Sequence, residues 1–136
     1  MDEFALIRRH FASLTPASTR GVTLGIGDDA AILKPPPGHE LLMTTDTLVA
    51  GRHFPLQTAA FDIGWKSLAV NLSDLAAMGA EPLWCLLALT LPTADEAWLS
   101  GFTAGLSQLA AQHRVALVGG DTTRGPLSIT ITAVGA

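Results

Sequence analysis

The sequence has few charged residues and a single cysteine. Only 15% of its 136 residues are charged, the formal net charge is −4, and the basic residues do not cluster. A broad nucleic-acid-binding surface is therefore not expected, and an anionic substrate would need a metal ion between it and the protein. Cys85 cannot form a disulfide within the chain. Its apolar setting, LWCLLAL, predicts a buried structural thiol rather than a nucleophile.

Segments that direct a chain to a membrane or out of the cell are also missing. The first residues, MDEFALIRRHFASL, do not follow the basic-then-apolar order of a signal peptide. No apolar run has the roughly 20 residues needed to span a bilayer. We therefore expect a cytoplasmic protein without membrane contact. The low charge content predicts either that apolar surface is buried between subunits or that the chain is part of a larger protein.

Hydrophobic periodicity and turn residues predict an alternation of strands and helices. Apolar residues at helical spacing predict helices over 2–14, 60–79 and 93–113, the last beginning with a capping box of Thr93 and Glu96. Strands are expected within 21–27, 30–38, 40–49, 83–91, 115–121 and 127–135, with a turn over 122–126. The run 83–91 is uniformly apolar, which predicts burial on both faces. This alternation indicates an α/β or α+β domain.

Aspartates occur at turns or strand ends in three places and on a helix in a fourth. Singly, each is more often a turn residue or a helix cap. Four such places in a chain with 12 acidic and 8 basic residues favour a cation site. Oxygen ligands indicate Mg²⁺, Mn²⁺ or Ca²⁺ rather than zinc, and Mg²⁺ completed by water and phosphate fits best. The residues are Asp28 and Asp29 after GIG, Asp46 after Thr44 and Thr45, Asp74 in NLSD, and Asp121 after Gly119 and Gly120.

The aspartate on the predicted helix can be placed by helical geometry. At about 100° per residue, Trp65, Leu68 and Leu72 fall in one apolar stripe, whereas Asn71 and Asp74 project together on the opposite side. The abundance of alanine and leucine predicts a largely buried helix. A buried Asp74 would need a partner.

Standard nucleotide motifs are not present. Neither GxxxxGK[ST] nor a GxGxxG after a strand occurs, although the glycine pairs would let backbone N–H groups approach an anion. His53 follows Asp46 by seven residues, in GRHFP. Spacing alone leaves open whether it is a solvated loop residue or part of a site.

Four segments in order, GIGDDAAIL, TTDTLVAGRHF, KSLAVNLSDLAAMGAEP and GGDTTRGPLSIT, resemble the thiamine-monophosphate kinase family. This family belongs to the superfamily of aminoimidazole ribonucleotide synthetase and selenophosphate synthetase. The resemblance implies a β-sheet with helices on one side that pairs with a second subunit into a β-barrel, and therefore a homodimer. It also implies transfer of the γ-phosphoryl group of ATP to thiamine monophosphate, with Mg²⁺ between aspartates and phosphates.

The resemblance also implies roles for individual residues. His53 would contact thiamine monophosphate, Gly120 and Asp121 would contact ATP, and Asp28 would cap the turn or bind a metal through water. The implied metal ligands are Asp29, Thr44, Thr45, Asp46, Asp74 and Asp121. Phosphoryl transfer between two anions requires charge neutralisation and alignment more than a strong base, and several aspartates with metal ions provide both.

Members of the family carry a second α/β domain that this sequence does not contain. Residues 1–136 are therefore expected to be an N-terminal ATP- and Mg²⁺-binding and dimerisation domain, inactive by itself. Two other hypotheses are a metal-binding dimerisation module without catalysis, and a sister enzyme of the superfamily with another substrate. His53 within TTDTLVAGRHF favours the thiamine kinase over its sisters.

Overall fold

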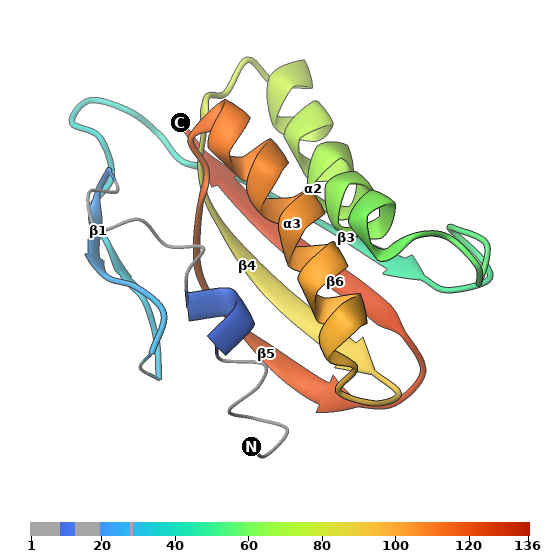
Figure 1. Cartoon of the computed structure of the whole chain (residues 1–136). Coiled ribbons are helices and arrows are strands. Elements are labelled where there is room, and N and C mark those ends of the chain that lie inside the picture. The colour runs from blue at the N-terminus through green and yellow to red at the C-terminus, as the bar shows by residue number, and fades with distance from the viewer. Residues whose placement is uncertain (1–8, 13–19, 28) are drawn as a thin grey trace.

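Four strands form the main sheet of the chain, in the order β3-β6-β4-β5 (Figure 1). They are β3 (Leu42–Val49), β4 (Pro82–Leu91), β5 (Ala116–Arg124) and β6 (Ser128–Gly135). The central strand β6 is antiparallel to both neighbours, whereas β4 and β5 are parallel. A parallel pair needs a long crossover, and α3 (Glu96–His113) provides it. The computed structural model describes residues 9–12, 20–27 and 29–136.

Both long helices, α2 (Ala60–Ala77) and α3, cover the same face of the sheet, as predicted (Figure 1). They approach each other closely because glycines line their contact. A Cβ atom on Gly105 would collide with the carbonyl oxygen of Phe61, and one on Gly64 would collide with that of Phe102. Beneath the helices lies the larger core, whose fully buried members include Leu68, Leu99, Phe102, Ile129 and Ile131.

The opposite face of the sheet is covered at one end only. A small hairpin of β1 (Val22–Leu24) and β2 (Ile32–Leu33) packs there over a second core. That core contains Leu83, Trp84, Ala116, Val118 and Val134. The remainder of the face is open and carries Met43, which is 67% exposed, and Leu86, which is 39% exposed.

Several predicted boundaries are confirmed, and others are wrong for local reasons. α2 starts at residue 60 as predicted, and the strands within 21–27 and 30–38 form the hairpin. The Thr93–Glu96 capping box is wrong, because Asp95 caps α3 and accepts from the backbone N–H groups of Ala97 and Trp98. The turn predicted over 122–126 is also too early, since β5 continues to Arg124.

Burial of the 83–91 strand on both faces is only partly correct. Leu83, Trp84 and Cys85 are buried in succession, but from Leu86 onward exposed and buried residues alternate. The hairpin reaches only the first part of β4, which explains the difference. Of the helix predicted over 2–14, residues 9–12 are helical and the others lie outside the described part of the chain. No helix within that part is long and apolar enough to cross a membrane.

Candidate functional site

Strand β3 directs neighbouring candidate ligands to opposite faces of the sheet. Asp46 pairs in register with Ile131, a residue of the core beneath the helices, and Thr44 lies on the same face. The Thr44 hydroxyl donates to Asp74 Oδ2 at 3.4 Å. Thr45 faces the open side, where its hydroxyl donates to the carbonyl oxygen of Ile131 at 3.2 Å. The structure therefore brings Thr44, Asp46 and Asp74 together and separates Thr45 from them.

Asp46 and Asp74 share a hydrogen bond between β3 and α2. Partial burial raises the pKa of Asp46 above its ordinary value of 3.8, and the hydrogen bond and charge repulsion with Asp74 raise it further. Two carboxylates in such contact repel each other when both are ionised. A divalent cation bound between them would remove that repulsion. The oxygen-only donor set, Thr44 Oγ1 with two carboxylates, suits a hard cation such as Mg²⁺.

Asn71 and Asp74 lie three residues apart on α2 but differ in burial. Asn71 is 0% exposed, and its Nδ2 donates to the carbonyl oxygen of Ser67 at 3.0 Å. Asp74 is exposed, so the prediction of a buried aspartate was wrong. The buried face of α2 includes the side that was expected to be polar, because the helix contacts both the sheet and α3.

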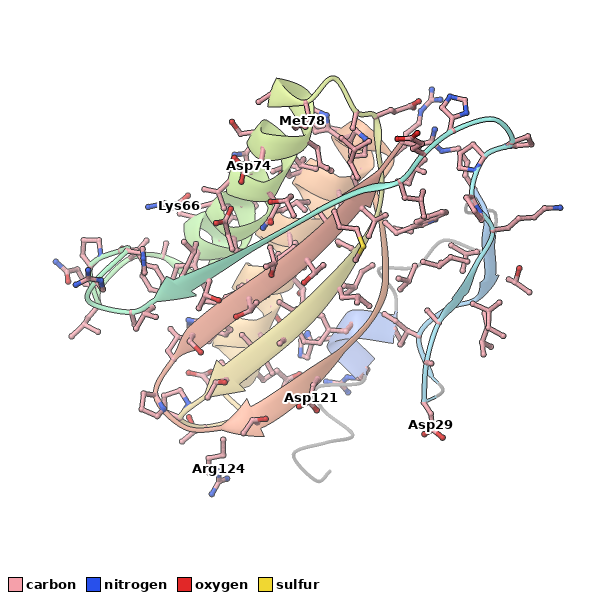
Figure 2. All side chains as sticks on the ribbon, turned by 180° about the vertical axis from the view of Figure 1, so that it is seen from behind. Asp29, Lys66, Asp74, Met78, Asp121 and Arg124 are labelled. Atoms are coloured by element: carbon pink, nitrogen blue, oxygen red, sulfur yellow. The ribbon has the colours of Figure 1, made fainter. Side chains whose placement is uncertain are left out.

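A second group of candidate residues lines a cleft between the hairpin and the sheet. The cleft has a volume of about 720 Å³, and Asp29, Gly120 and Asp121 are among its lining residues. Figure 2 shows Asp29 at the tip of the hairpin and Asp121 on β5. Gly120 has a φ of 150°, and a Cβ atom there would collide with the carbonyl oxygen of Leu87, so glycine is required. Asp28 lies outside the described residues.

Cys85 contributes to the wall of this cleft but is not a nucleophile. It is 1% exposed, and burial raises the pKa of its thiol to about 12. A thiol with that pKa is protonated at neutral pH and unreactive. The prediction of a buried structural cysteine is confirmed.

The loop after β3 presents His53 in a fixed orientation. The backbone N–H of His53 donates to the carbonyl oxygen of Val49, and the N–H of Val49 donates to ring atom Nδ1, both at 2.9 Å. Lys66 on α2 donates from Nζ to the carbonyl oxygen of His53 at 2.7 Å. Phe54 is buried and anchors the loop to the core. Lys66 was not among the predicted site residues, because a contact between a helix and a loop leaves no mark in local sequence patterns.

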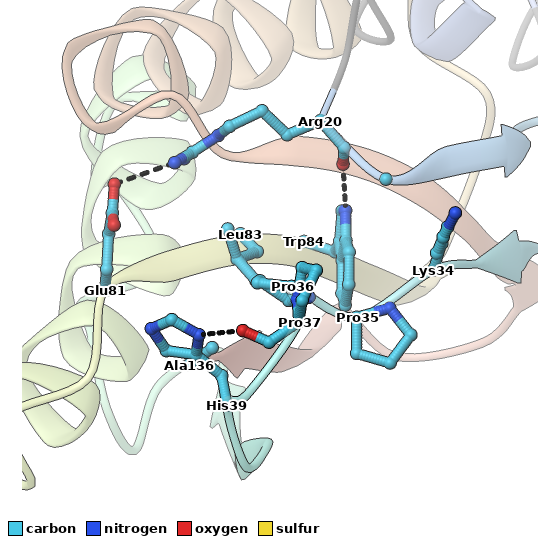
Figure 3. Close-up of a pocket in the computed structure, with 11 residues that line it drawn as sticks. Arg20, Lys34, Pro35, Pro36, Pro37, His39, Glu81, Leu83, Trp84 and Ala136 are labelled. Atoms are coloured by element: carbon cyan, nitrogen blue, oxygen red, sulfur yellow. Dashed lines mark hydrogen bonds and ion pairs between the residues drawn. The ribbon is translucent and has the colours of Figure 1, made fainter.

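A further cavity of about 440 Å³ contains none of the predicted site residues (Figure 3). Its polar contacts hold the hairpin to the sheet. Arg20 Nη1 forms an ion pair with Glu81 Oε1 at 2.8 Å, and Trp84 Nε1 donates to the carbonyl oxygen of Arg20 at 2.8 Å. The Arg20 guanidinium also lowers the pKa of Glu81. We interpret this cavity as part of the hairpin attachment.

The candidate ligands thus form two groups within one chain. Asp46 and Asp74 lie at the β3 edge of the sheet, whereas Asp121 lies on β5 at the other edge, with β6 and β4 between them. Among the described residues, no three His, Cys, Asp or Glu side chains lie close enough together to hold a metal ion. The described residues therefore do not assemble the single cluster of aspartates that the motifs suggest.

Comparisons with known proteins agree with this architecture. Thiamine-monophosphate kinase of Escherichia coli K12 is 54% identical over 129 residues, which are 95% of this chain and 39% of that protein. The crystal structure of thiamine-monophosphate kinase from Stenotrophomonas maltophilia K279a superimposes with a TM-score of 0.84 at 59% identity, covering 99% of this chain and 42% of that one. AaThiL complexed with AMPPCP and TMP matches with a TM-score of 0.67 at 33% identity, over 70% of this chain and 31% of that one.

The chain therefore spans about two fifths of the length of these relatives. The sequence family described as "AIR synthase related protein, N-terminal domain" matches residues 27–136, which is most of the chain and includes every strand of the main sheet. This chain belongs to the family of AIR synthase related proteins, whose N-terminal domain it contains.

Proposed function

We propose that this chain is the N-terminal part of a thiamine-monophosphate kinase, which transfers the γ-phosphoryl group of ATP to thiamine monophosphate and forms thiamine diphosphate. The similarity to kinases of that name supports the reaction. One structural observation carries the proposal for this chain, namely the cleft that places Asp29 on the hairpin together with Gly120 and Asp121 on β5. The proposed enzyme acts in the cytoplasm, where ATP and Mg²⁺ are available.

The cleft suits a nucleotide with its phosphates. Its apolar lining includes Ile26, Leu33 and Val118, which can pack against a base or ribose, and Asp29 and Asp121 supply its carboxylates. Gly120 also lines the cleft, in a backbone conformation that only glycine allows because a Cβ atom would meet Leu87 of β4. Asp29 and Asp121 would hold Mg²⁺, which when bound neutralises and aligns the phosphates.

The β3 edge suits the phosphate acceptor. His53 offers a fixed ring at the surface, and Asp46, Asp74 and Thr44 present oxygen ligands to further Mg²⁺ ions. Thr45 is proposed as a ligand only from the open face of the sheet, since its hydroxyl points there. Because the reacting groups are both phosphates, the residues here bind and orient their substrates rather than abstract a strongly held proton.

A homodimer is part of the proposal. The open face of the sheet carries exposed Met43, Val49 and Leu86 beside a threonine-rich surface, which is a large area for a small chain to leave in water. A second copy packed on this face would close the two sheets into a β-barrel. Such pairing would also bring the β5 edge of one copy nearer to residues of the other, whereas a single chain keeps its two groups of aspartates apart.

A second candidate is a metal-binding dimerisation module that has no catalysis of its own. The coverage of only 39% of the Escherichia coli relative favours it for the 136-residue chain in isolation. The two candidates are compatible if this domain is part of a longer protein that supplies the remaining contacts. We call that protein the full-length enzyme.

The test is an assay of ADP and thiamine diphosphate formation from ATP, Mg²⁺ and thiamine monophosphate. The full-length enzyme is expected to turn over, and the 136-residue chain is expected to show no measurable activity, because in-line transfer depends on positioning both substrates. Absence of thiamine diphosphate with the full-length enzyme would refute the proposed function. Activity of the 136-residue chain within about tenfold of the full-length enzyme would show that this domain suffices.

A further inference from the structure

The hydrogen bonds of His53 leave one of its polar atoms available for a ligand. The backbone N–H and the ring Nδ1 are both engaged with Val49, and the backbone carbonyl accepts from Lys66. Because Nδ1 accepts a hydrogen bond, the proton of the neutral ring lies on Nε2. His53 is exposed, so this Nε2–H is a donor whose direction is set before a ligand arrives.

Lys66 places a positive charge against the backbone of the same residue. Its ammonium group has three N–H donors, and one of them goes to the carbonyl oxygen of His53. In the part of the chain that the structure describes, the ion pairs are Arg9–Glu96 and Arg20–Glu81, and neither involves Lys66. A hydrogen bond to a neutral carbonyl leaves the charge of the lysine available to an anion.

The position of Lys66 also links the loop to the acidic pair. Lys66 and Asp74 lie on the same helix, and Figure 2 shows both on the side of α2 next to the β3 edge. The bond to His53 therefore fixes the loop relative to the element that carries Asp74.

We propose that Lys66 is a second phosphate-binding residue beside His53, and that it recognises a phosphate monoester. The identity of the ester as thiamine monophosphate rests on the proposed function. A phosphate monoester presents several oxygens, so it can accept from the Nε2–H of His53 and from the ammonium of Lys66 together. Charge-assisted bonds of this kind are stronger than neutral ones, and lysine provides a compact charge for phosphate.

Direct binding can be followed by NMR, because the chain contains only two lysines, Lys34 and Lys66. Lys34 is exposed, lies next to the hairpin strand β2 and serves as an internal control. The chain, labelled with ¹³C-lysine and ¹⁵N-histidine, is titrated with thiamine monophosphate and, separately, with inorganic phosphate. The Lys66 ε-methylene and His53 Nε2 signals are expected to shift with one common dissociation constant while Lys34 does not respond. Unchanged Lys66 signals, or equal shifts of both lysines, would overturn the proposal.

Kinetics of the full-length enzyme provide a second test. Lys66→Met keeps the length of the side chain but removes the charge, and is expected to raise the KM for thiamine monophosphate about tenfold or more, with the KM for ATP unchanged. Lys66→Arg should recover most of the affinity, and Lys34→Met should behave as wild type. Equal changes in both KM values would overturn the proposal. If the wild-type enzyme does not use thiamine monophosphate at all, the proposed function fails, and the titration with inorganic phosphate still decides the role of Lys66.

Discussion

Asp46 on strand β3 and Asp74 on helix α2 share a hydrogen bond across the gap between helix and sheet. Each comes from a separate motif, and neither has a basic partner among the ion pairs of the described residues. Two carboxyl groups in contact are destabilising when both are ionised, unless a cation lies between them. This relationship is the reason for the first two predictions.

The first prediction concerns pH. Because the pKa of Asp46 is raised above 3.8 in the folded chain, the folded state retains a proton that the unfolded state has already lost. The free energy of unfolding should therefore be higher below that ordinary pKa and fall as the pH rises through the raised value. Mg²⁺ added above this range should restore stability by binding the folded state. Urea unfolding across pH 3.5 to 7, with and without Mg²⁺, measures both effects, and Asp46→Asn should flatten the profile.

The second prediction concerns catalysis by the full-length enzyme. Asp46→Asn and Asp121→Asn should each lower turnover by about two orders of magnitude or more, because each removes a charged metal ligand where charge stabilises the transition state. Asp62→Asn is the matched control, since Asp62 is an exposed aspartate in the first turn of α2. Circular dichroism should show an intact fold in all three variants. Near-normal turnover of both test variants would indicate that these aspartates are structural residues of turns and strand ends and not metal ligands.

The third prediction concerns the different roles of the two ring nitrogens of His53. His53→Asn can keep the acceptor for the N–H of Val49 but loses the outward Nε2–H donor, whereas His53→Ala loses both. Both variants should weaken the use of thiamine monophosphate more than the use of ATP, and His53→Ala should also loosen the loop. Steady-state kinetics with each substrate varied in turn will test this. A parallel loss for both substrates would indicate a purely structural role.

The fourth prediction concerns the contact between the two helices. Gly105→Ala should lower the free energy of unfolding by about 2 to 3 kcal/mol, because the added methyl group meets the carbonyl oxygen of Phe61. Gly101→Ala is the milder control. Its Cβ would lie 3.1 Å from that of Ala60, and the gain of about 1 kcal/mol in helix propensity offsets the crowding. Urea denaturation measures both, and equal stability of the two variants would contradict the close packing.

The fifth prediction concerns oligomeric state. The chain should sediment as a dimer at micromolar concentration, and Thr130→Arg should convert it to a monomer. Thr130 lies on the open face of β6, where its hydroxyl is 2.7 Å from that of Thr47, so an arginine there would place a charge within the proposed contact. Gln108→Arg on exposed α3 surface should leave the dimer unchanged. A wild-type chain that is monomeric at this concentration would rule out pairing through the sheet.

The sequence predicted individual elements better than their mutual arrangement. Helical periodicity placed α2 over 60–79, close to its observed bounds, and apolar runs located the strands of the sheet. Strand order could not be predicted, because nothing in local periodicity indicates that β6 lies between β3 and β4. The separation of Asp46 from Asp121 follows from that order, so the expected single cluster could not have been tested on the sequence alone.

The contacts of individual side chains also could not be predicted from the sequence. Helical geometry grouped Asn71 with Asp74 correctly by angle, but it could not show that α2 is buried on the side of Asn71 by its contacts with the sheet and α3. Similarly, Asp95 and Thr93 are both good capping residues, and only the backbone conformation decided for Asp95. The contact between Lys66 and His53 could not be predicted either. It depends on the path of the loop, which the burial of Phe54 in the core fixes.

The central position of β6 affects how a nascent chain can fold. β6 is the last of the four main strands to leave the ribosome, yet β3 and β4 both depend on it for their hydrogen bonds. Until residues 128–135 emerge, β3 has no neighbour in the main sheet and β4 has one unpaired edge, and apolar strands with free edges are prone to aggregation. The unit of β4, α3 and β5 is continuous in sequence and can assemble first. Insertion of β6 then completes the sheet, so a chain released before residue 128 should be a substrate for chaperones rather than a stable intermediate.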